Sequence, residues 1–458
     1  MAMASTYAPP SIEPLRGGRS NKFGARPRGS HLVRDRIEGA AVADLIERFG
    51  SPLFVFSERR LRRACRRVRQ AFAQRWGDVE LAWSYKTNYL PAICRIMHQE
   101  GSLAEVVSAM EYEMARANGV PGSRIIYNGP LKSPASLRQA VADGALINLD
   151  HLGEIDDLRQ AAEAAEAAPR VGIRINLDAG IVPQWSRFGF NLESGEAAEA
   201  VSRLVDAGLA PCALHCHLGT YIMDPGAYEL QVAKLVAFAH QLEDRFGVVI
   251  GTYDLGGGLP SLSRLKGTYL PPDVVVPPVE EYAERIVAAL RAALRADEHP
   301  RLVLEPGRAL VDEAGWLICS VGAVKRLPDG TRAYVLDAGV NLLYTSTWYR
   351  FAIELERETP GEPEPSLLYG PLCMNIDILD EAVPLPPLER GQRVILSPVG
   401  AYNITQWMQF IHYRPAVVLV GDDGQVEPIR LGEGIADVLG PARTPERLQG
   451  NGPGPCAS

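Results

Sequence analysis

The chain has 458 residues, of which 47% are hydrophobic and 22% are charged, and its net charge at pH 7 is −8. This balance is ordinary for a globular protein with an ample apolar core, and the negative charge argues against a general affinity for nucleic acid. Because the chain contains no run of about 18 apolar residues, we expect no membrane partner. Its seven cysteines are scattered without a CxxC pair, which favours a reducing, cytoplasmic location over a disulfide framework.

The two ends of the chain lack apolar runs. Residues 1–30 are rich in Pro, Gly, Ser and Arg, and residues 441–458 include a Gly-Asn-Gly-Pro-Gly run. Both compositions predict flexible segments, an N-terminal extension and a C-terminal tail. Residues 31–45 are expected to form a strand that joins a second, C-terminal domain.

Between residues 46 and 310, short apolar segments alternate with segments of helical pattern. This alternation is typical of a parallel sheet with crossover helices, and the count suits a closed (β/α)8 TIM barrel of the α/β class. The expected strands are Pro52–Phe56, Val79–Tyr85, Leu103–Val107, Ile125–Tyr127, Ala145–Asn148, Val171–Ile175, Ala213–His217, Tyr253–Leu255 and Leu302–Leu304.

After residue 310 the pattern changes to strand-like runs separated by Gly, Pro and Asp turns, with few helical segments. The runs are Trp316–Val324, Ala333–Leu336, Arg393–Leu396 and Ala416–Val420. We therefore predict a C-terminal antiparallel β domain over residues 311–440.

Lys86 stands directly after the expected strand 79–85. Parallel barrels carry their chemistry at the carboxyl ends of the strands, and a lysine there can lose its proton and form a Schiff base with a carbonyl. A lysine at a strand end is more often a solvated surface charge. The case for Lys86 therefore depends on the motifs that follow it.

Further chemistry-bearing residues follow later expected strands. Gly256, Gly257 and Gly258 offer bare amides that can approach a phosphate, although three glycines are more often only a turn. Arg308 offers a planar fork for a phosphate or a carboxylate. Glu305 can hold a ring nitrogen protonated, or it can simply pair with Arg308.

His215 and His217 share one face of a strand because the side-chain period is two. They do not complete a ligand set, so no metal is expected, and His217 is better suited to cover a cofactor as a flat ring. Cys373 is by default a small buried apolar residue. A Schiff-base lysine, a phosphate cradle, a carboxylate for a pyridinium nitrogen and a stacking imidazole together indicate a pyridoxal 5'-phosphate site.

A set of short motifs, in this order along the chain, also resembles a known family. The set is Tyr85 to Asn88, His215 to Thr220, Gly256 to Gly258, Glu305 to Arg308, Gly370 to Asp377 and Gly400 to Tyr402. It resembles the fold-type III pyridoxal-phosphate decarboxylases, which include the diaminopimelate, ornithine and arginine decarboxylases. The resemblance covers about residues 35–440 and implies an alanine-racemase-like barrel followed by a β domain.

The resemblance also implies roles for single residues. Lys86 would be the Schiff-base lysine, His217 would stack on the ring, and Glu305 would pair with the pyridine nitrogen. Arg174 would lie near the ring, and Glu105 would lie near the lysine. The phosphate would be held by Gly256, Gly257, Gly258, Arg308 and Tyr402.

The resemblance further implies a homodimer with shared active sites. Cys373 would reach across the interface as the acid that protonates the α carbon of the substrate. The residues implied to contact the substrate are Arg308, Tyr349, Met374, Asn375 and Asp377.

The positions that would read the far end of the substrate depart from the family pattern. Diaminopimelate decarboxylases carry Cys-Glu-Ser where this chain has Cys373-Met374-Asn375, and their substrate-binding arginine aligns with Thr345. Losing both polar contacts disfavours a diaminopimelate end, since sites built for hydrogen bonds discriminate strongly. We therefore expect a decarboxylase (a carboxy-lyase) for an amino acid or amino-acid conjugate of secondary-metabolite or siderophore type. The alternatives are a diaminopimelate decarboxylase that makes L-lysine and a non-catalytic pyridoxal-phosphate-binding homologue.

Overall fold

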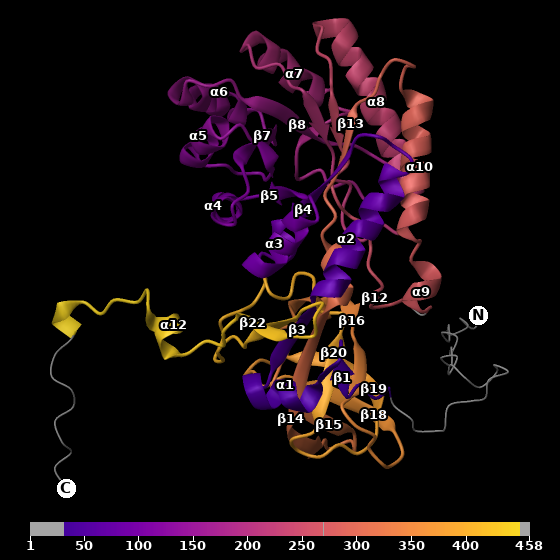
Figure 1. Ribbon diagram of the computed structural model, residues 1–458, viewed down its shortest axis with the longest axis vertical. Coiled ribbons are helices and arrows are strands. Elements are labelled where there is room, and N and C mark those ends of the chain that lie inside the picture. Colours follow the sequence, from indigo (N-terminus) through magenta and orange to yellow (C-terminus); the bar gives the residue numbers. More distant parts are fainter. Residues whose placement is uncertain (1–31, 269, 449–458) are drawn as a thin grey trace, which may run out of the picture.

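The computed structural model describes residues 32–268 and 270–448, and it contains a barrel stacked end to end on a β domain (Figure 1). The extension expected over residues 1–30 lies outside the described residues, as does the tail from residue 449 onward. Within the described ranges, no helix has both the length and the apolar character needed to cross a bilayer. The six cysteines described there are all free thiols.

Eight parallel strands form the barrel, and the predicted TIM-barrel architecture is confirmed. The ring closes because β10 pairs with both β8 and β11, and β13 pairs with β4. The strands are short and mostly buried, as expected for a sheet covered on both faces. They are β4 (Val79–Ser84), β5 (Leu103–Val106), β6 (Ile125–Tyr127), β7 (Leu146–Leu149), β8 (Arg170–Asn176), β10 (Ala213–His215), β11 (Thr252–Asp254) and β13 (Arg301–Leu304).

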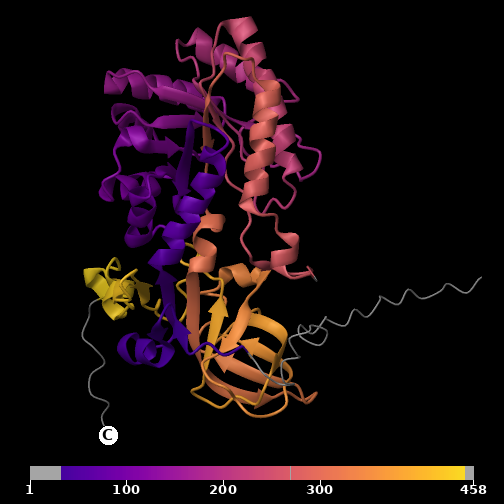
Figure 2. The ribbon, with the colours of Figure 1, turned by 45° about the vertical axis from the view of Figure 1, so that its right-hand side comes forward.

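Helices surround the barrel and bury their apolar faces against the strands. Several begin at a serine whose side chain accepts a backbone N–H of the first turn, as Ser57, Ser108 and Ser133 do. Both views show α10 side by side with α8 (Figures 1 and 2). The long helices are α2 (Glu58–Ala73), α3 (Pro91–Gln99), α4 (Ala109–Ala117), α5 (Pro134–Ala142), α6 (Gly153–Ala165), α7 (Glu196–Asp206), α8 (Gly226–Phe246) and α10 (Val279–Ala293).

The second sheet belongs to the β domain and runs in the order β19-β18-β15-β14-β3-β21-β22, with β20 pairing β14 and β17. Most pairs are antiparallel, but β15 with β18 and β3 with β21 are parallel. The strands are β3 (Leu53–Ser57), β14 (Gly315–Arg326), β15 (Arg332–Leu336), β17 (Ala352–Leu355), β18 (Glu364–Tyr369), β19 (Ile378–Leu385), β20 (Arg393–Ser397), β21 (Val417–Val420) and β22 (Val426–Arg430).

The N-terminal part of the described chain differs from the sequence-based expectation. Strand β3, expected as the first barrel strand, pairs instead with β14 and β21 of the β domain. All its residues are buried, and a strand buried on both faces has the same apolar run in either sheet. The segment expected to join the β domain does so briefly: Val33 bridges Leu355 of β17, and the Arg34 N–H donates to the Leu355 carbonyl at 2.8 Å. It then forms a small hairpin of β1 (Arg36–Ile37) and β2 (Ala40–Ala41) before α1 (Val42–Phe49).

Residues from the β domain reach the carboxyl end of the barrel. The Tyr402 backbone N–H donates to the carbonyl of Thr87 at 2.9 Å, and the Thr405 hydroxyl donates to the carbonyl of Lys86 at 2.9 Å. The carboxyl ends of the strands are therefore joined to the second domain at the place where Lys86 stands.

Candidate active site

Lys86 follows β4 in the short turn η1 (Tyr85–Thr87), and it forms an ion pair with Glu105 of β5. The Lys86 Nζ lies 2.8 and 2.6 Å from the two carboxylate oxygens of Glu105. Burial acts to lower the pKa of Lys86, but the negative charges of Glu105 and Glu305 outweigh it and hold that pKa above its usual value. The Lys86 side chain keeps 37% of its surface exposed, so a carbonyl compound can reach it.

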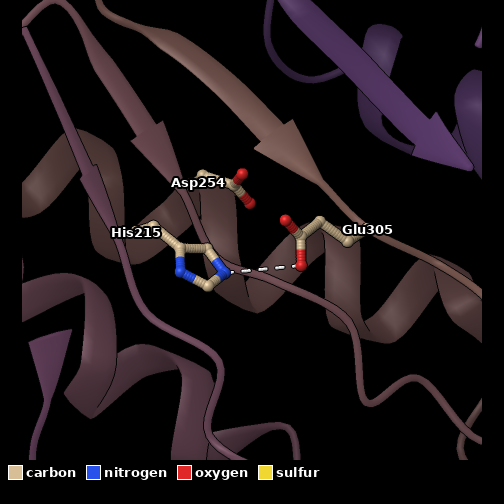
Figure 3. A group of neighbouring side chains, drawn as sticks. All are labelled: His215, Asp254 and Glu305. Carbon is tan, nitrogen blue, oxygen red and sulfur yellow. Dashed lines mark hydrogen bonds and ion pairs between the residues drawn. The ribbon is translucent and has the colours of Figure 1, made fainter. Parts of the chain in front are cut away.

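Glu305 lies at the end of β13 in a buried group with His215 and Asp254 (Figure 3). His215 Nε2 is 3.4 Å from Glu305 Oε2. Burial acts to raise the pKa of Glu305, but His215, Lys86 and His217 bring it below its usual value. Burial and then the charge of Glu305 raise the pKa of Asp254 well above its usual value. The pKa values of the two carboxyl groups are thus shifted in opposite directions, so a proton is held more readily by Asp254 than by Glu305.

The same group is the one place in residues 32–268 and 270–448 where three donor atoms gather as a metal site requires, within 4.8 Å of one another. From the sequence, His215 and His217 share one strand face without completing a ligand set, and no metal is expected. The structure instead sets His215 beside Asp254 and Glu305. The absence of a metal stays a prediction.

His217 is fixed by the glycine-rich segment that follows β11. The Gly257 N–H donates to His217 Nδ1 at 3.0 Å, and the Gly256 N–H donates to Asp254 at 2.9 Å. Burial, and then the positive charges of Arg174 and Lys86, lower the pKa of His217 to about 3, so its ring is neutral. Trp185 meets the ring edge-on, with centroids 5.4 Å apart.

The glycines at this place are required by close packing. A Cβ on Gly256 would lie 2.8 Å from His217, and one on Gly257 would lie 2.5 Å from the carbonyl oxygen of Glu305. Two of the three amides already hold Asp254 and His217. The segment therefore positions these two side chains whatever it also does for a phosphate.

Arg308 is the first residue of α11 (Arg308–Val311), and two of the tyrosines predicted for the site lie next to its guanidinium group. Its guanidinium carbon lies 4.4 Å from the centre of the Tyr349 ring and 5.1 Å from that of Tyr402. Its Nη1 donates to Asp312 at 3.2 Å, while its buried Nε has no hydrogen-bond partner among the described residues. Tyr402 adopts a left-handed backbone, with φ of 61°, to stand there.

Arg174 lies within β8, buried beside Asp150 at 3.7 Å and over the ring of Phe188 at 4.6 Å. Its charge contributes to the low pKa of His217, which places it in the same electrostatic environment.

The segment Gly370–Asp377 is organised by its last residue. Both Asp377 carboxylate oxygens accept backbone N–H groups at 2.8 Å, one from Val340 and one from Leu372. Cys373 and Asn375 are exposed, while Met374 is partly buried against the core. No hydrogen bond or ion pair in the described ranges joins these three residues to Lys86.

The hydrogen-bond donors of Thr345 are already used within the protein. Its backbone N–H and its hydroxyl both donate to Asn403 Oδ1, at 3.3 and 2.9 Å. Thr345 and Asn403 are both buried.

Sequence reasoning missed one residue in the centre of the site. Asn128, directly after β6, donates from a single Nδ2 to Glu105 at 3.1 Å and to Glu305 at 2.6 Å. The available signal was its place at the end of a barrel strand, where Lys86, Glu105 and Glu305 also stand.

These residues fit pyridoxal phosphate. The lysine is reachable, the imidazole is neutral, the carboxylate of Glu305 is buried and ionised, and the buried Arg308 Nε lacks a partner. A lysine, a carboxylate for a ring nitrogen and an arginine at the strand ends of a parallel barrel define a pyridoxal-phosphate enzyme of the barrel type.

Comparison with known families agrees with this class. Residues 58–312 match the family described as "Pyridoxal-dependent decarboxylase, pyridoxal binding domain". The chain belongs to this family, and it is a pyridoxal-phosphate-dependent carboxy-lyase that acts on an amino acid.

Relatives match over nearly the whole chain. A diaminopimelate decarboxylase from Actinosynnema pretiosum subsp. auranticum is 32% identical over 453 residues, covering 95% of this chain and 96% of the relative. One from Methanothermobacter thermautotrophicus is 29% identical over 433 residues, covering 91% and 97%. The crystal structure of the Methanocaldococcus jannaschii enzyme with L-lysine has a TM-score of 0.82 at 26% identity, covering 92% of this chain and 99% of that one. The comparisons support the diaminopimelate alternative better than the siderophore-type expectation.

Proposed function

We propose that the protein is a diaminopimelate decarboxylase that forms L-lysine. The observation that carries the proposal is the likeness to diaminopimelate decarboxylases through both domains, at 32% identity over 95% of the chain in one case. The site geometry supports the proposal. Lys86 is reachable, Glu305 is buried and ionised, a backbone amide fixes His217, and the buried Arg308 Nε has no hydrogen-bond partner among the described residues.

We propose the following roles for the chain's own residues. Lys86 would hold pyridoxal phosphate through its amine, and when free it would hold or move a proton at the substrate amine. Glu105 keeps the Lys86 amine oriented, since both its oxygens lie within hydrogen-bond distance. Glu305 holds a proton on the ring nitrogen, which an ionised buried carboxylate can stabilise. Bound pyridoxal phosphate supplies the electron sink that accepts the electron pair left by carbon dioxide.

The neutral ring of His217 suits stacking on one face of the cofactor. The Gly257 amide holds its Nδ1, so the ring cannot rotate freely. Arg308 and Tyr402, together with Gly256, Gly257 and Gly258, are proposed to bind the phosphate. The unpartnered Arg308 Nε and the two tyrosine rings beside the guanidinium support this.

The protonating acid is proposed to come from a second copy of the chain. Cys373 is exposed, and Asp377 holds its loop to the β domain of its own subunit. An exposed thiol on an ordered loop is suited to complete a neighbouring site in a homodimer. Contacts of Tyr349, Met374, Asn375 and Asp377 with the substrate stay predictions, as does the cytoplasmic location.

A second candidate function is decarboxylation of a conjugated amino acid, and one observation favours it. The two positions that differ from the diaminopimelate pattern offer little to a charged distal group. Met374 is apolar, and the Thr345 hydroxyl already donates to Asn403. A neutral distal group would leave no buried charge unpaired there.

The deciding experiment measures carbon dioxide release from a substrate panel. It contains meso-diaminopimelate, lysine, ornithine, arginine, glutamate, and citrate- or carrier-linked amino acids. We expect meso-diaminopimelate to be turned over with one L-lysine formed per carbon dioxide. Turnover of conjugates alone would establish the second candidate instead. If the protein shows no visible absorption after incubation with pyridoxal phosphate, it does not bind the cofactor, and both candidate decarboxylase functions are rejected.

A further inference from the structure

Asn128 stands between the two carboxylates on which the proposed site depends. Its single Nδ2 carries two protons, and it lies 3.1 Å from Glu105 Oε1 and 2.6 Å from Glu305 Oε1. Asn128, Glu105 and Glu305 are all buried. Glu105 binds Lys86, and Glu305 is proposed to face the ring nitrogen of the cofactor. The Asn128 amide therefore connects the carboxylate beside the Schiff-base lysine with the carboxylate proposed for the ring nitrogen.

The chemistry of the neighbours fixes which way the Asn128 amide faces. Both carboxylates are acceptors, so turning the amide would put its oxygen against two negative charges. The Asn148 Nδ2 donates to the Asn128 Oδ1 at 2.8 Å, which requires the same orientation. Asn148 is held closely in turn, because a Cβ on Gly172 would lie 2.0 Å from its Oδ1.

We propose that Asn128 is a positioning residue that couples Glu105 to Glu305, so that the proton held at Lys86 and the proton held at the ring nitrogen depend on each other. The proposal rests on the roles proposed above for Lys86 and Glu305. In this proposal Asn128 contacts neither the substrate nor the reacting atoms. It acts through the carboxylates of Glu105 and Glu305.

The coupling has a physical reason in the reaction. Lys86 would have no free ammonium group to offer Glu105 while its amine is bonded to the cofactor, and it would regain one when the substrate amine takes its place. Among the described residues, the donors that remain to Glu105 without the Lys86 ammonium group are the Ser84 hydroxyl, at 2.6 Å, and the Asn128 amide. Without Asn128, two buried negative charges would face each other with less compensation, and a group so placed takes up a proton instead.

The alternative role is purely structural, in which Asn128 only satisfies buried acceptors. The two roles differ in a spectroscopic readout, because only in the coupling role does a change at Asn128 alter, through Glu105, the titration of the lysine-linked cofactor. The charged or titratable groups that interact electrostatically with Lys86 are Glu105, Glu305 and Tyr402, together with His217 and Glu111.

The test titrates the visible absorption of the cofactor-loaded protein against pH. Asn128→Ala is expected to move the midpoint by about one pH unit, the size expected for losing a hydrogen bond to a charged group. Asn118→Ala is the matched control, because Asn118 donates to the Tyr85 hydroxyl at 3.3 Å and to neither carboxylate. In a Glu105→Gln background, Asn128→Ala is expected to move the midpoint by less than half as much.

Asn128→Asp is the second variant, and it keeps the side-chain shape while replacing both donors. It is expected to shift the midpoint at least as far as Asn128→Ala. The proposed coupling is overturned if the absorption midpoint of the Asn128 variants equals that of Asn118→Ala. It is also overturned if the midpoint shifts caused by the Asn128 and Glu105 substitutions are additive. If neither Asn128 variant folds, the absorption midpoint is measured in Glu105→Gln, Glu305→Gln and their double variant. The proposed coupling is overturned if the midpoint shift of the double variant equals the sum of the two single shifts. Visible absorption that persists in Lys86→Ala would instead overturn the proposed function.

Discussion

The Gly257 amide donates to Nδ1 of His217 at 3.0 Å, so a backbone group from the segment after β11 sets the ring that follows β10. The bond assigns Nδ1 as the acceptor, and with the pKa lowered to about 3 by burial and by neighbouring positive charges, Nε2 carries the single ring proton. A motif that is predicted from the sequence to bind phosphate thus also supports the imidazole of His217, which is proposed to stack on the cofactor.

Gly257→Ala should disturb this support directly. The new Cβ would lie 2.5 Å from the carbonyl oxygen of Glu305, a backbone atom that cannot move aside cheaply. We expect a loss of about 1–3 kcal/mol in the free energy of unfolding, together with weaker cofactor binding. Urea unfolding and titration with pyridoxal phosphate measure the two effects. Gly251→Ala is the control, because its Cβ would meet nothing within 4 Å; equal behaviour of the two variants would contradict the argument.

Glu111 should make stability depend on pH. Burial, and then the charge of Glu105, raise the pKa of Glu111 from 4.5 to about 7. The folded state therefore keeps a proton that the unfolded state has released, and stability falls as pH rises from about 4.5 to about 7. Glu111→Gln removes this loss, so the variant should gain up to about 3 kcal/mol over the parent at pH 8 and little at pH 4.

Thermal or urea unfolding across this pH range measures the difference. Glu113→Gln, an exposed position on the same helix, is the matched control. A Glu111→Gln variant whose gain is the same at every pH would show that the carboxyl group is not titrating in this window.

Replacing only one partner of the buried ion pair between Lys132 and Glu154 should strongly lower the free energy of unfolding. The Lys132 Nζ lies 3.0 and 3.2 Å from the two Glu154 oxygens, with both side chains essentially inaccessible. Lys132→Met leaves a buried charge unpaired and should destabilise by about 3–5 kcal/mol. Adding Glu154→Gln should recover most of this, because the amide oxygen still accepts the Asp150 N–H.

The exposed pair of Lys234 and Glu193 provides the comparison. Its side chains are 38% and 40% exposed, so Lys234→Met should cost less than about 1 kcal/mol. Chemical denaturation of the parent and the three variants measures these differences. A double variant no more stable than Lys132→Met would reject the unpaired-charge explanation.

The sequence revealed the barrel strands because short apolar runs alternate with capped helical segments, a local pattern. It misplaced β3 because a strand buried on both faces looks alike in either sheet, and only the pairing with β14 and β21 decides. Lys86, His217 and Arg308 could be found as reactive types at strand ends. The role of Asn128 could not, because an asparagine gains it only through contacts between residues far apart in the chain.

Cys373 provides the test of shared active sites. Lys86→Ala homodimers should be inactive, and Cys373→Ala homodimers should lose most of kcat, since each lacks one residue in both sites. If Cys373 serves the neighbouring subunit, a mixed dimer of the two variants contains one site with both residues. Random mixing makes half of the dimers mixed, so about a quarter of the parent activity should return. Activity that stays at the level of the separate variants, in mixtures shown by mass to exchange subunits, would place Cys373 and Lys86 in the same subunit's site or remove Cys373 from catalysis.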